Sequence, residues 1–390
     1  MNFSKLTLLM CFLFMMISGS IAQKQTQNMT EEQIRVKYPR AKIEEARKAG
    51  EASLERWKKK REQALAIAQR HNLPVRVEDK NHKVIELQYF QNGRPVYFKT
   101  NNLDAAETIS TDEVWQFPYF LDGTSITAAI WDGGMVRNSH QELVGRVIQQ
   151  DTASKPNYHA THVAGTMIAT GSSANAQGMA YQANLDAYDW GADLSEIFLS
   201  PVWTNVSNHS YSITAGWDYD DSLEVWFWYG DETISETEDF NFGFYTSRSD
   251  TVDDYINFYR PYHLIVVAVG NDRTDNGPGP NGGHYVWSPA DTAWIWSTTT
   301  RDPDGGLSHF DCIPGGLATA KNVLTVGAVY DINGGYSQTG DVVMTDFSSW
   351  GPTDDGRIKP DIVANGYELY SCTSLNNSSY GFLSETIPMT

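Results

Sequence analysis

Two polar segments near the middle of the chain carry residue types that could transfer protons. Asp132 follows an apolar run at residues 126–131 and precedes two glycines, and His159 and His162 follow in a second segment. An imidazole can accept a proton from a hydroxyl group, and a nearby carboxylate can fix the tautomer of the ring and stabilise its cationic form. His159 therefore has the residue type of a general base, and Asp132 has that of its orienting partner.

Each of these residues also has a simpler interpretation. Asp132 precedes Gly133 and Gly134, and an aspartate before glycines is ordinary turn chemistry. The spacing of His159 and His162 could place two metal ligands on one helix face. The zinc pattern HExxH is absent, however, and no third ligand is apparent, so the sequence predicts no metal site.

The elements around the pair would bring it to one place. The run at 126–131 predicts a buried strand, and the small and apolar residues at 159–170 predict a helix that Gly171 can close. Functional groups in an open α/β sheet gather beyond the carboxyl ends of the strands. We therefore expect Asp132 and His159 to meet at one edge of the sheet.

From about residue 101 the chain alternates between strand-like and helix-like segments, which predicts a mostly parallel, doubly wound α/β sheet. A crossover helix is expected at 251–259. The stretch 272–320 is rich in Gly, Pro, Asp and Asn and predicts a long surface excursion. Further strands are expected at 184–188, 205–210, 262–269 and 322–329.

Residues 23–100 form a separate unit by charge and by pattern. They hold 18 Lys and Arg against 10 Asp and Glu, whereas residues 101–390 hold 10 against 38. The acidic part disfavours a nucleic-acid partner and would attract the basic part. Helix formers at 46–69 and an Asn92-Gly93 turn predict a helix followed by a β-hairpin.

The segments Ile130-Trp131-Asp132-Gly133-Gly134 and His159-Ala160-Thr161-His162-Val163-Ala164-Gly165-Thr166 resemble the Asp and His segments of the subtilisin-like serine peptidases, the peptidase S8 family. The resemblance runs from about residue 105 to residue 384, and Asp before His is the order of that family. It implies a subtilisin-like fold and hydrolysis of polypeptide substrates. It assigns His159 as the base, Asp132 as its orienter, and His162 to packing or a backbone contact.

The same resemblance implies further site residues. Asn271, after an apolar strand, would supply the amide donor of an oxyanion hole. Ser210, Tyr211 and Ser212 would offer backbone groups to a substrate that binds as an added strand, although Tyr211 could equally be core packing. No cofactor is implied. Calcium ions could bind, but the sequence identifies no site for them.

The last residues depart from the family pattern. The family expects Ser-Gly-Thr-Ser-Met-Ala followed by a helix, and here Ser384-Glu385-Thr386-Ile387 puts isoleucine at the nucleophile's place. We therefore expect the domain at 101–390 to be incomplete at its C-terminus, as in a truncated or frame-shifted precursor, and inactive as given. The alternative is a pseudopeptidase that binds peptides without cutting them.

The remaining features concern export and small details. Residues 1–22 have the pattern of a cleaved signal peptide; the alternative, an uncleaved anchor, is disfavoured because the apolar run is shorter than the ~20 residues that cross a bilayer. No later run is long enough to span a membrane, so a secreted or periplasmic protein is expected. Residues 23–100 would then be a pro-segment that binds the peptidase domain. Cys312 and Cys372 could form a disulfide or remain buried thiols. In the aromatic stretch 217–244, buried packing is favoured over a carbohydrate platform.

Overall fold

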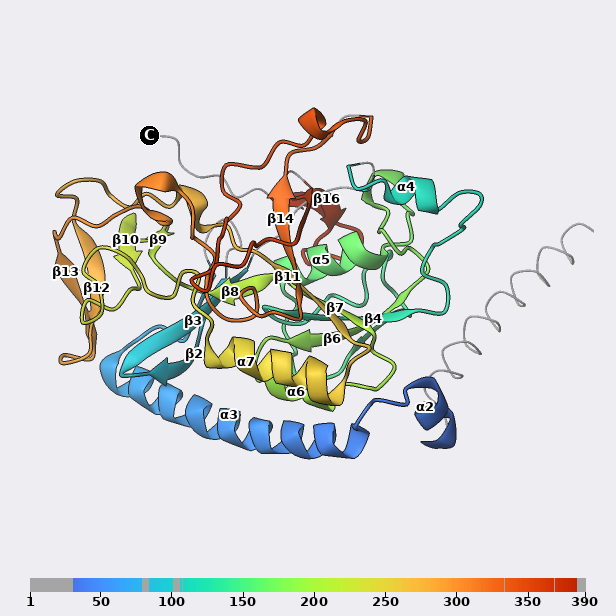
Figure 1. The fold of residues 1–390 in the computed structure, drawn as a ribbon, viewed down its shortest axis with the longest axis horizontal. Coiled ribbons are helices and arrows are strands. Elements are labelled where there is room, and N and C mark those ends of the chain that lie inside the picture. The colour runs from blue at the N-terminus through green and yellow to red at the C-terminus, as the bar shows by residue number, and fades with distance from the viewer. Residues whose placement is uncertain are drawn as a thin grey trace, which may run out of the picture.

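The computed structural model describes residues 31–78, 84–100, 106, 108–332, 334–367 and 369–383. Its centre is a seven-stranded parallel sheet with the order β15-β14-β11-β7-β4-β6-β5. Figure 1 labels β14, β11, β7, β4 and β6 of this sheet. The chain enters at β4, builds one side of the sheet, and then crosses to β7 and the other side, which is doubly wound topology. The strands are β4 Thr127–Asp132, β5 Val147–Gln149, β6 Asn184–Asp189, β7 Val206–His209, β11 Leu264–Ala268, β14 Leu324–Val329 and β15 Ile362–Asn365.

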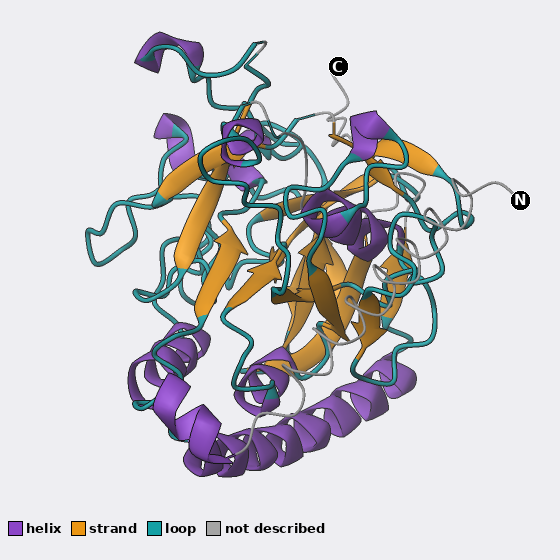
Figure 2. Ribbon diagram, turned by 90° about the vertical axis from the view of Figure 1, so that its right-hand side faces the viewer, coloured by secondary structure: helices purple, strands orange, loops and turns teal. Residues whose placement is uncertain are grey.

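Helices lie on both sides of this sheet (Figure 2). Alternate residues of β4 point to opposite faces, so Ile130 packs in the core under α5 Tyr158–Ile168, while Trp131 packs in the core under α6 Asp193–Leu199. The predicted crossover helix is present, but it begins earlier, as α7 Ser247–Asp254, and continues as a π-helical turn at Tyr255–Tyr259. The predicted α/β fold and its five strands are confirmed.

The segment at residues 31–100, called the N-terminal segment below, contains the predicted helix and hairpin. After the short α2 Glu31–Lys37, the long α3 Ile43–His71 runs beside α6 (Figure 1). A Cβ on Gly50 would lie only 2.7 Å from Leu199 Cγ, so the two helices approach very closely. β1 Arg76–Glu78, β2 Val84–Gln91 and β3 Arg94–Thr100 form an antiparallel sheet that β8 Tyr211–Ile213 completes.

The hairpin turn has the conformation that its residues favour. Asn92 and Gly93 have φ of +50° and +78°, and Gln91 pairs with Arg94 on either side of them. Positive φ at both central residues is the requirement of the tight hairpin turn that Asn-Gly predicts.

The stretch 272–320 is only partly a surface excursion. It contributes two strands to a second sheet, called the insert sheet below, whose order is β13-β12-β10-β9. It then enters the main core, where Ile313 and Ala320 are fully buried. The prediction was wrong here because Gly and Pro mark the turns but say nothing of the strands between them. The strands are β9 Trp217–Asp220, β10 Val225–Trp228, β12 His284–Ser288 and β13 Ala293–Ser297.

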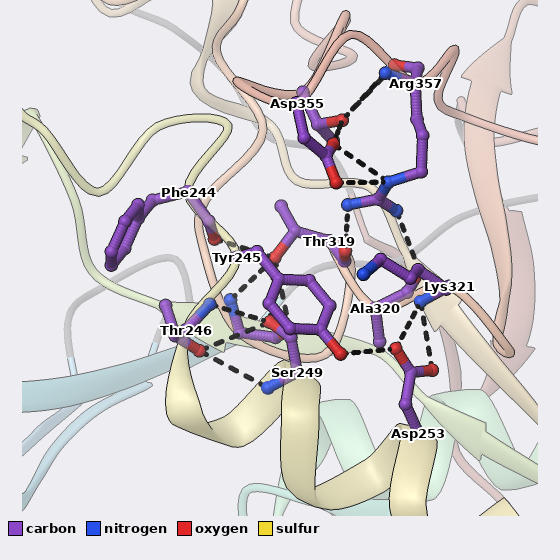
Figure 3. Close-up of polar contacts among 12 residues, drawn as sticks. Phe244, Tyr245, Thr246, Ser249, Asp253, Thr319, Ala320, Lys321, Asp355 and Arg357 are labelled. Atoms are coloured by element: carbon purple, nitrogen blue, oxygen red, sulfur yellow. Dashed lines mark hydrogen bonds and ion pairs between the residues drawn. The ribbon is translucent and has the colours of Figure 1, made fainter. Parts of the chain in front are cut away.

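Polar contacts hold the end of this stretch against α7 (Figure 3). Ser249 Oγ donates to the carbonyl of Gly316 at 2.6 Å, and Thr319 Oγ1 donates to the carbonyl of Phe244 at 2.9 Å. The carboxylate of Asp253 accepts hydrogen bonds from the backbone amides of Lys321 and Asn322. Buried backbone groups that enter the core away from regular structure are satisfied in this way.

The remaining elements are short. The ribbon of β16 Leu369–Cys372 and β17 Tyr380–Leu383 packs on α5. Cys312 and Cys372 are buried free thiols in different core clusters, so the structure has the thiol alternative and not the bridge. Among the residues described, no helix is long and apolar enough to cross a bilayer. Other helical turns are α4 Thr111–Val114, η1 Ala174–Ala176, η3 Asp272–Thr274, η4 Gly306–Ser308 and η5 Thr339–Asp341.

Candidate active site

The structure brings Asp132 and His159 into direct contact. Asp132 is the last residue of β4, and His159 lies in the first turn of α5, whose start is fixed by the side chain of Asn157 accepting from Ala160 N at 2.8 Å. His159 Nδ1 and Asp132 Oδ1 are 2.7 Å apart, and the two residues are only 3% and 1% exposed. The pair predicted from sequence spacing is therefore a buried hydrogen-bonded pair.

The carboxylate is held so that it fixes one tautomer of the ring. Asp132 Oδ1 also accepts from the backbone amide of Gly133 at 2.7 Å, and Oδ2 makes no hydrogen bond to any described residue. When His159 Nδ1 carries the proton and donates it to this carboxylate, the basic lone pair lies on Nε2. The arrangement is that of a base ready to accept a proton at Nε2.

An aromatic stack supports the strand that carries Asp132. The Trp131 ring stacks on Tyr188 of β6 at 4.2 Å and on His209 of β7 at 5.1 Å. Trp131 Nε1 donates to Glu196 Oε2 at 3.1 Å, and burial raises the pKa of Glu196 to about 9. Three adjacent strands are thus locked together immediately before the site.

His162 has the packing role expected of it. Its Nε2 donates to the carbonyls of Leu369 and Gly381, at 3.1 and 3.2 Å. Burial, and then the nearby His159, lower the pKa of His162 to about 3, so the ring is neutral at neutral pH. It ties α5 to the β16–β17 ribbon.

Ser210, Tyr211 and Ser212 lie where β7 passes into β8. The Tyr211 side chain faces the core, is 2% exposed and donates to Asp193 Oδ2 at 2.8 Å, which is the packing alternative. The backbone forms the sheet edge, but this edge already holds a strand: Tyr211 pairs with Thr100 and Ser212 with Lys99 of β3. The predicted peptide-binding edge is covered by the N-terminal segment.

Asn271 follows β11 and lies at a pocket that Ser210 also lines. Gly270, with φ of +108°, turns the chain here, and Ser349 Oγ accepts from Asp272 N at 3.0 Å to hold the loop. The pocket joins these two predicted residues, whereas Asp132 and His159 are not among its lining residues. Others that line it are Thr166, Val326, Phe347 and Asn365.

One group of carboxylates carries no sequence signal and is seen only in the structure. Oxygen atoms of Asp272, Asp275 and Asp304 all lie within 4.8 Å of one another. Calcium prefers oxygen ligands, so these three could together hold such an ion. Asp304 also accepts from the backbone amide of Trp217 at 3.0 Å. Asp272 and Asp304 are far apart in the chain, and no local spacing signals their approach.

Comparison with known proteins gives one family match and several similar chains. The sequence model of the subtilase family, Peptidase_S8, matches residues 125–386. The chain is 27% identical over 287 residues to the serine protease AprX of Bacillus subtilis, covering 70% of this chain and 53% of that protein. It is 39% identical over 98 residues to the uncharacterized protein aq_aa18 of Aquifex aeolicus, covering 24% of this chain and 42% of that protein.

The chain thus spans about half the length of these two relatives. Among solved structures, the CspB protease of Clostridium perfringens is similar with a TM-score of 0.45 and 15% identity. That match covers 72% of this chain and 83% of that one.

Proposed function

Since the chain belongs to the subtilase family, we propose that it is the precursor of a serine endopeptidase that hydrolyses peptide bonds in polypeptides. The observation that carries this proposal is the buried hydrogen bond between Asp132 and His159 at the carboxyl end of β4. A carboxylate and an imidazole in this order and geometry are the two supporting members of a catalytic triad.

Each site residue then has a role. His159 Nε2 takes the proton of a serine hydroxyl as that oxygen attacks the substrate carbonyl, and Asp132 stabilises the imidazolium that forms. The Asn271 amide donates to the oxyanion, an interaction whose loss typically costs about 10²–10³-fold in turnover. The substrate strand pairs with the β8 edge near Tyr211 through its backbone.

We further propose that residues 1–390 do not include the nucleophile. Ile387 stands at the place where the family has its serine, and isoleucine has no group that can attack a carbonyl. Residues 384–390 lie outside the described residues. A chain of these 390 residues alone should therefore be inactive.

The N-terminal segment is proposed to be a pro-segment that blocks the site until it is removed. Its β3 occupies the β8 edge, and its α3 covers α6. The proposed signal at residues 1–22 lies outside the described residues, and export to the periplasm or the medium remains part of this proposal. Sequencing the N-terminus of the exported protein would test both processing points.

Labelling with a fluorophosphonate tests the peptidase proposal. The 390-residue chain should not be labelled, and a chain extended by a Ser-Gly-Thr-Ser-Met-Ala segment and its helix should be labelled once its N-terminal segment has been cleaved. His159→Ala in the extended chain should abolish labelling, while exposed Glu113→Gln should not. Labelling of the unextended chain would refute the missing nucleophile. If the extended chain is folded and binds peptides but is neither labelled nor hydrolytic, the non-catalytic alternative holds.

A further inference from the structure

The tip of the N-terminal hairpin lies on the insert sheet. Cross-strand pairs place Phe227, Tyr285 and Trp287 on one face of that sheet, together with Trp294. At one end of this face, Trp287 packs against Phe90 of β2, with ring centroids 6.0 Å apart. The insert sheet and the hairpin thus share an aromatic contact.

Hydrogen bonds fix the turn itself in this position. Trp287 Nε1 donates to the carbonyl of Gly93 at 2.9 Å. Trp287 itself is only 1% exposed. The one polar atom of its side chain is therefore satisfied by the backbone of the hairpin turn.

Arg94, the first residue of β3, enters a polar site at the end of β10. Its Nη2 donates to Asp231 Oδ1 at 2.7 Å, and its Nη1 donates to the carbonyl of Gly230 at 2.8 Å. The two side chains are only 12% and 11% exposed. A planar guanidinium that meets a carboxylate and a carbonyl together is held more specifically than a lysine ammonium would be.

The carboxylate of this site is also held by hydrogen bonds within its own loop, which follows β10 of the insert sheet. Asp231 Oδ1 accepts from both the backbone amide and the hydroxyl of Thr233, at 2.9 and 2.7 Å. Although burial alone would raise the pKa of Asp231, the Thr233 hydrogen bonds and then Arg94 bring it below its usual value. The carboxylate is therefore ionised and oriented for a cation.

We propose that the insert sheet is a receptor for the tip of the N-terminal hairpin, with Asp231 and Gly230 as its arginine-binding site. β3 runs without interruption from Arg94 in this site to Thr100 on the β8 edge. Holding one end of β3 therefore keeps its other end on the peptide-binding edge. The inference rests on the proposed function, because it identifies what retains the blocking segment there.

Hydrogen–deuterium exchange of the full 390-residue chain tests the proposal. Arg94→Ala and Asp231→Asn should each speed the exchange of β3 amides about tenfold or more, while amides of β4 and β6 keep their rates. The double variant should be no faster than the faster single variant, because both changes remove one contact. Asp355→Asn is the control, since it weakens another Arg–Asp pair, that of Arg357 and Asp355, which lies outside the insert sheet.

Two results would overturn the receptor: unchanged exchange in β3, or equal acceleration in β3, β4 and β6. Should an Arg94 or Asp231 variant fail to fold, Trp287→Phe keeps an aromatic ring at this position, removes the donor to Gly93 and should speed the exchange of β3 amides in the same way. Exchange requires no peptidase activity. A negative fluorophosphonate result therefore leaves this test intact, and a negative exchange result leaves the peptidase proposal intact.

Discussion

Arg76 of β1 donates from Nη2 to the carbonyl of Gly133, at 2.5 Å, and Gly133 is the residue directly after Asp132. The other terminal nitrogen of Arg76 donates to Glu86 Oε2 at 2.6 Å, an oxygen that also accepts from Trp190 Nε1 at 3.0 Å. The N-terminal segment therefore holds two neighbouring loops, one after β4 and one after β6. Its contact extends to the backbone of the loop that directly follows Asp132.

Arg76→Ala should lower the free energy of unfolding by about 1 kcal/mol. The value is modest because the Arg76 side chain is 34% exposed, so solvent screens its charge. Urea denaturation of the full chain measures the effect. Arg70→Ala is the control, because among the described residues its guanidinium bonds only to the carbonyl of Ala66 in its own helix. Equal losses in the two variants would mean that the Gly133 contact contributes nothing.

Gly165→Ala should destabilise the protein by about 1–3 kcal/mol through overpacking. A Cβ at Gly165 would lie 2.3 Å from Ser371 Oγ and 2.9 Å from Cys372 Cβ, so α5 would have to move away from β16. This loss outweighs the gain of about 1 kcal/mol in helix propensity. At Gly340 a Cβ meets nothing within 4 Å, so Gly340→Ala should be nearly neutral. Thermal unfolding measures the stability of both variants. Equal melting temperatures would mean that α5 does not pack tightly against β16 at Gly165.

Glu196→Gln should change how stability depends on pH. Burial raises the pKa of Glu196 to about 9, above its unfolded value, so the native state keeps a proton that the unfolded state releases. This group therefore stabilises the fold fully below about pH 4.5, and that contribution is lost as pH rises toward 9.

Glutamine can still accept from Trp131 but does not titrate. The variant should therefore gain stability relative to the parent progressively from pH 5 to pH 9, as followed by urea midpoints. A constant difference across this range would contradict the raised pKa.

Asp132→Asn should lower kcat by about 10⁴-fold in a chain that carries the nucleophile, because the amide no longer fixes the productive tautomer of His159. The fold should survive, since asparagine can still accept from Gly133 N. Peptide hydrolysis measures the loss of kcat, and a circular dichroism spectrum shows whether the fold is kept. A variant that keeps most of its kcat would remove Asp132 from the mechanism.

Sequence patterns were most informative where one short segment carries the whole signal. The apolar run before Asp132, the start of α5 at His159 and the Asn92-Gly93 turn are all local features, and each lies where the pattern predicts. The insert sheet could not be predicted in this way, because Trp228 of β10 pairs with Val286 of β12 across a long loop. Such pairing depends on cross-strand contacts and leaves no periodicity in either segment alone.

The same limit applies to the sites. Arg94 and Asp231 are 137 positions apart, and neither lies in a recognisable motif. Tyr211 was expected to contact either substrate or core, and only its buried hydrogen bond to Asp193 decides for the core. Burial of polar side chains is decided by tertiary packing, which composition does not reveal.

The acceptors of His162 have a consequence for the order of assembly. The two carbonyls that accept hydrogen bonds from its Nε2, those of Leu369 and Gly381, come more than 200 positions later in the chain. On a ribosome, α5 is synthesised long before these partners emerge. The helix that carries His159 therefore makes its last contacts only when translation has passed residue 381.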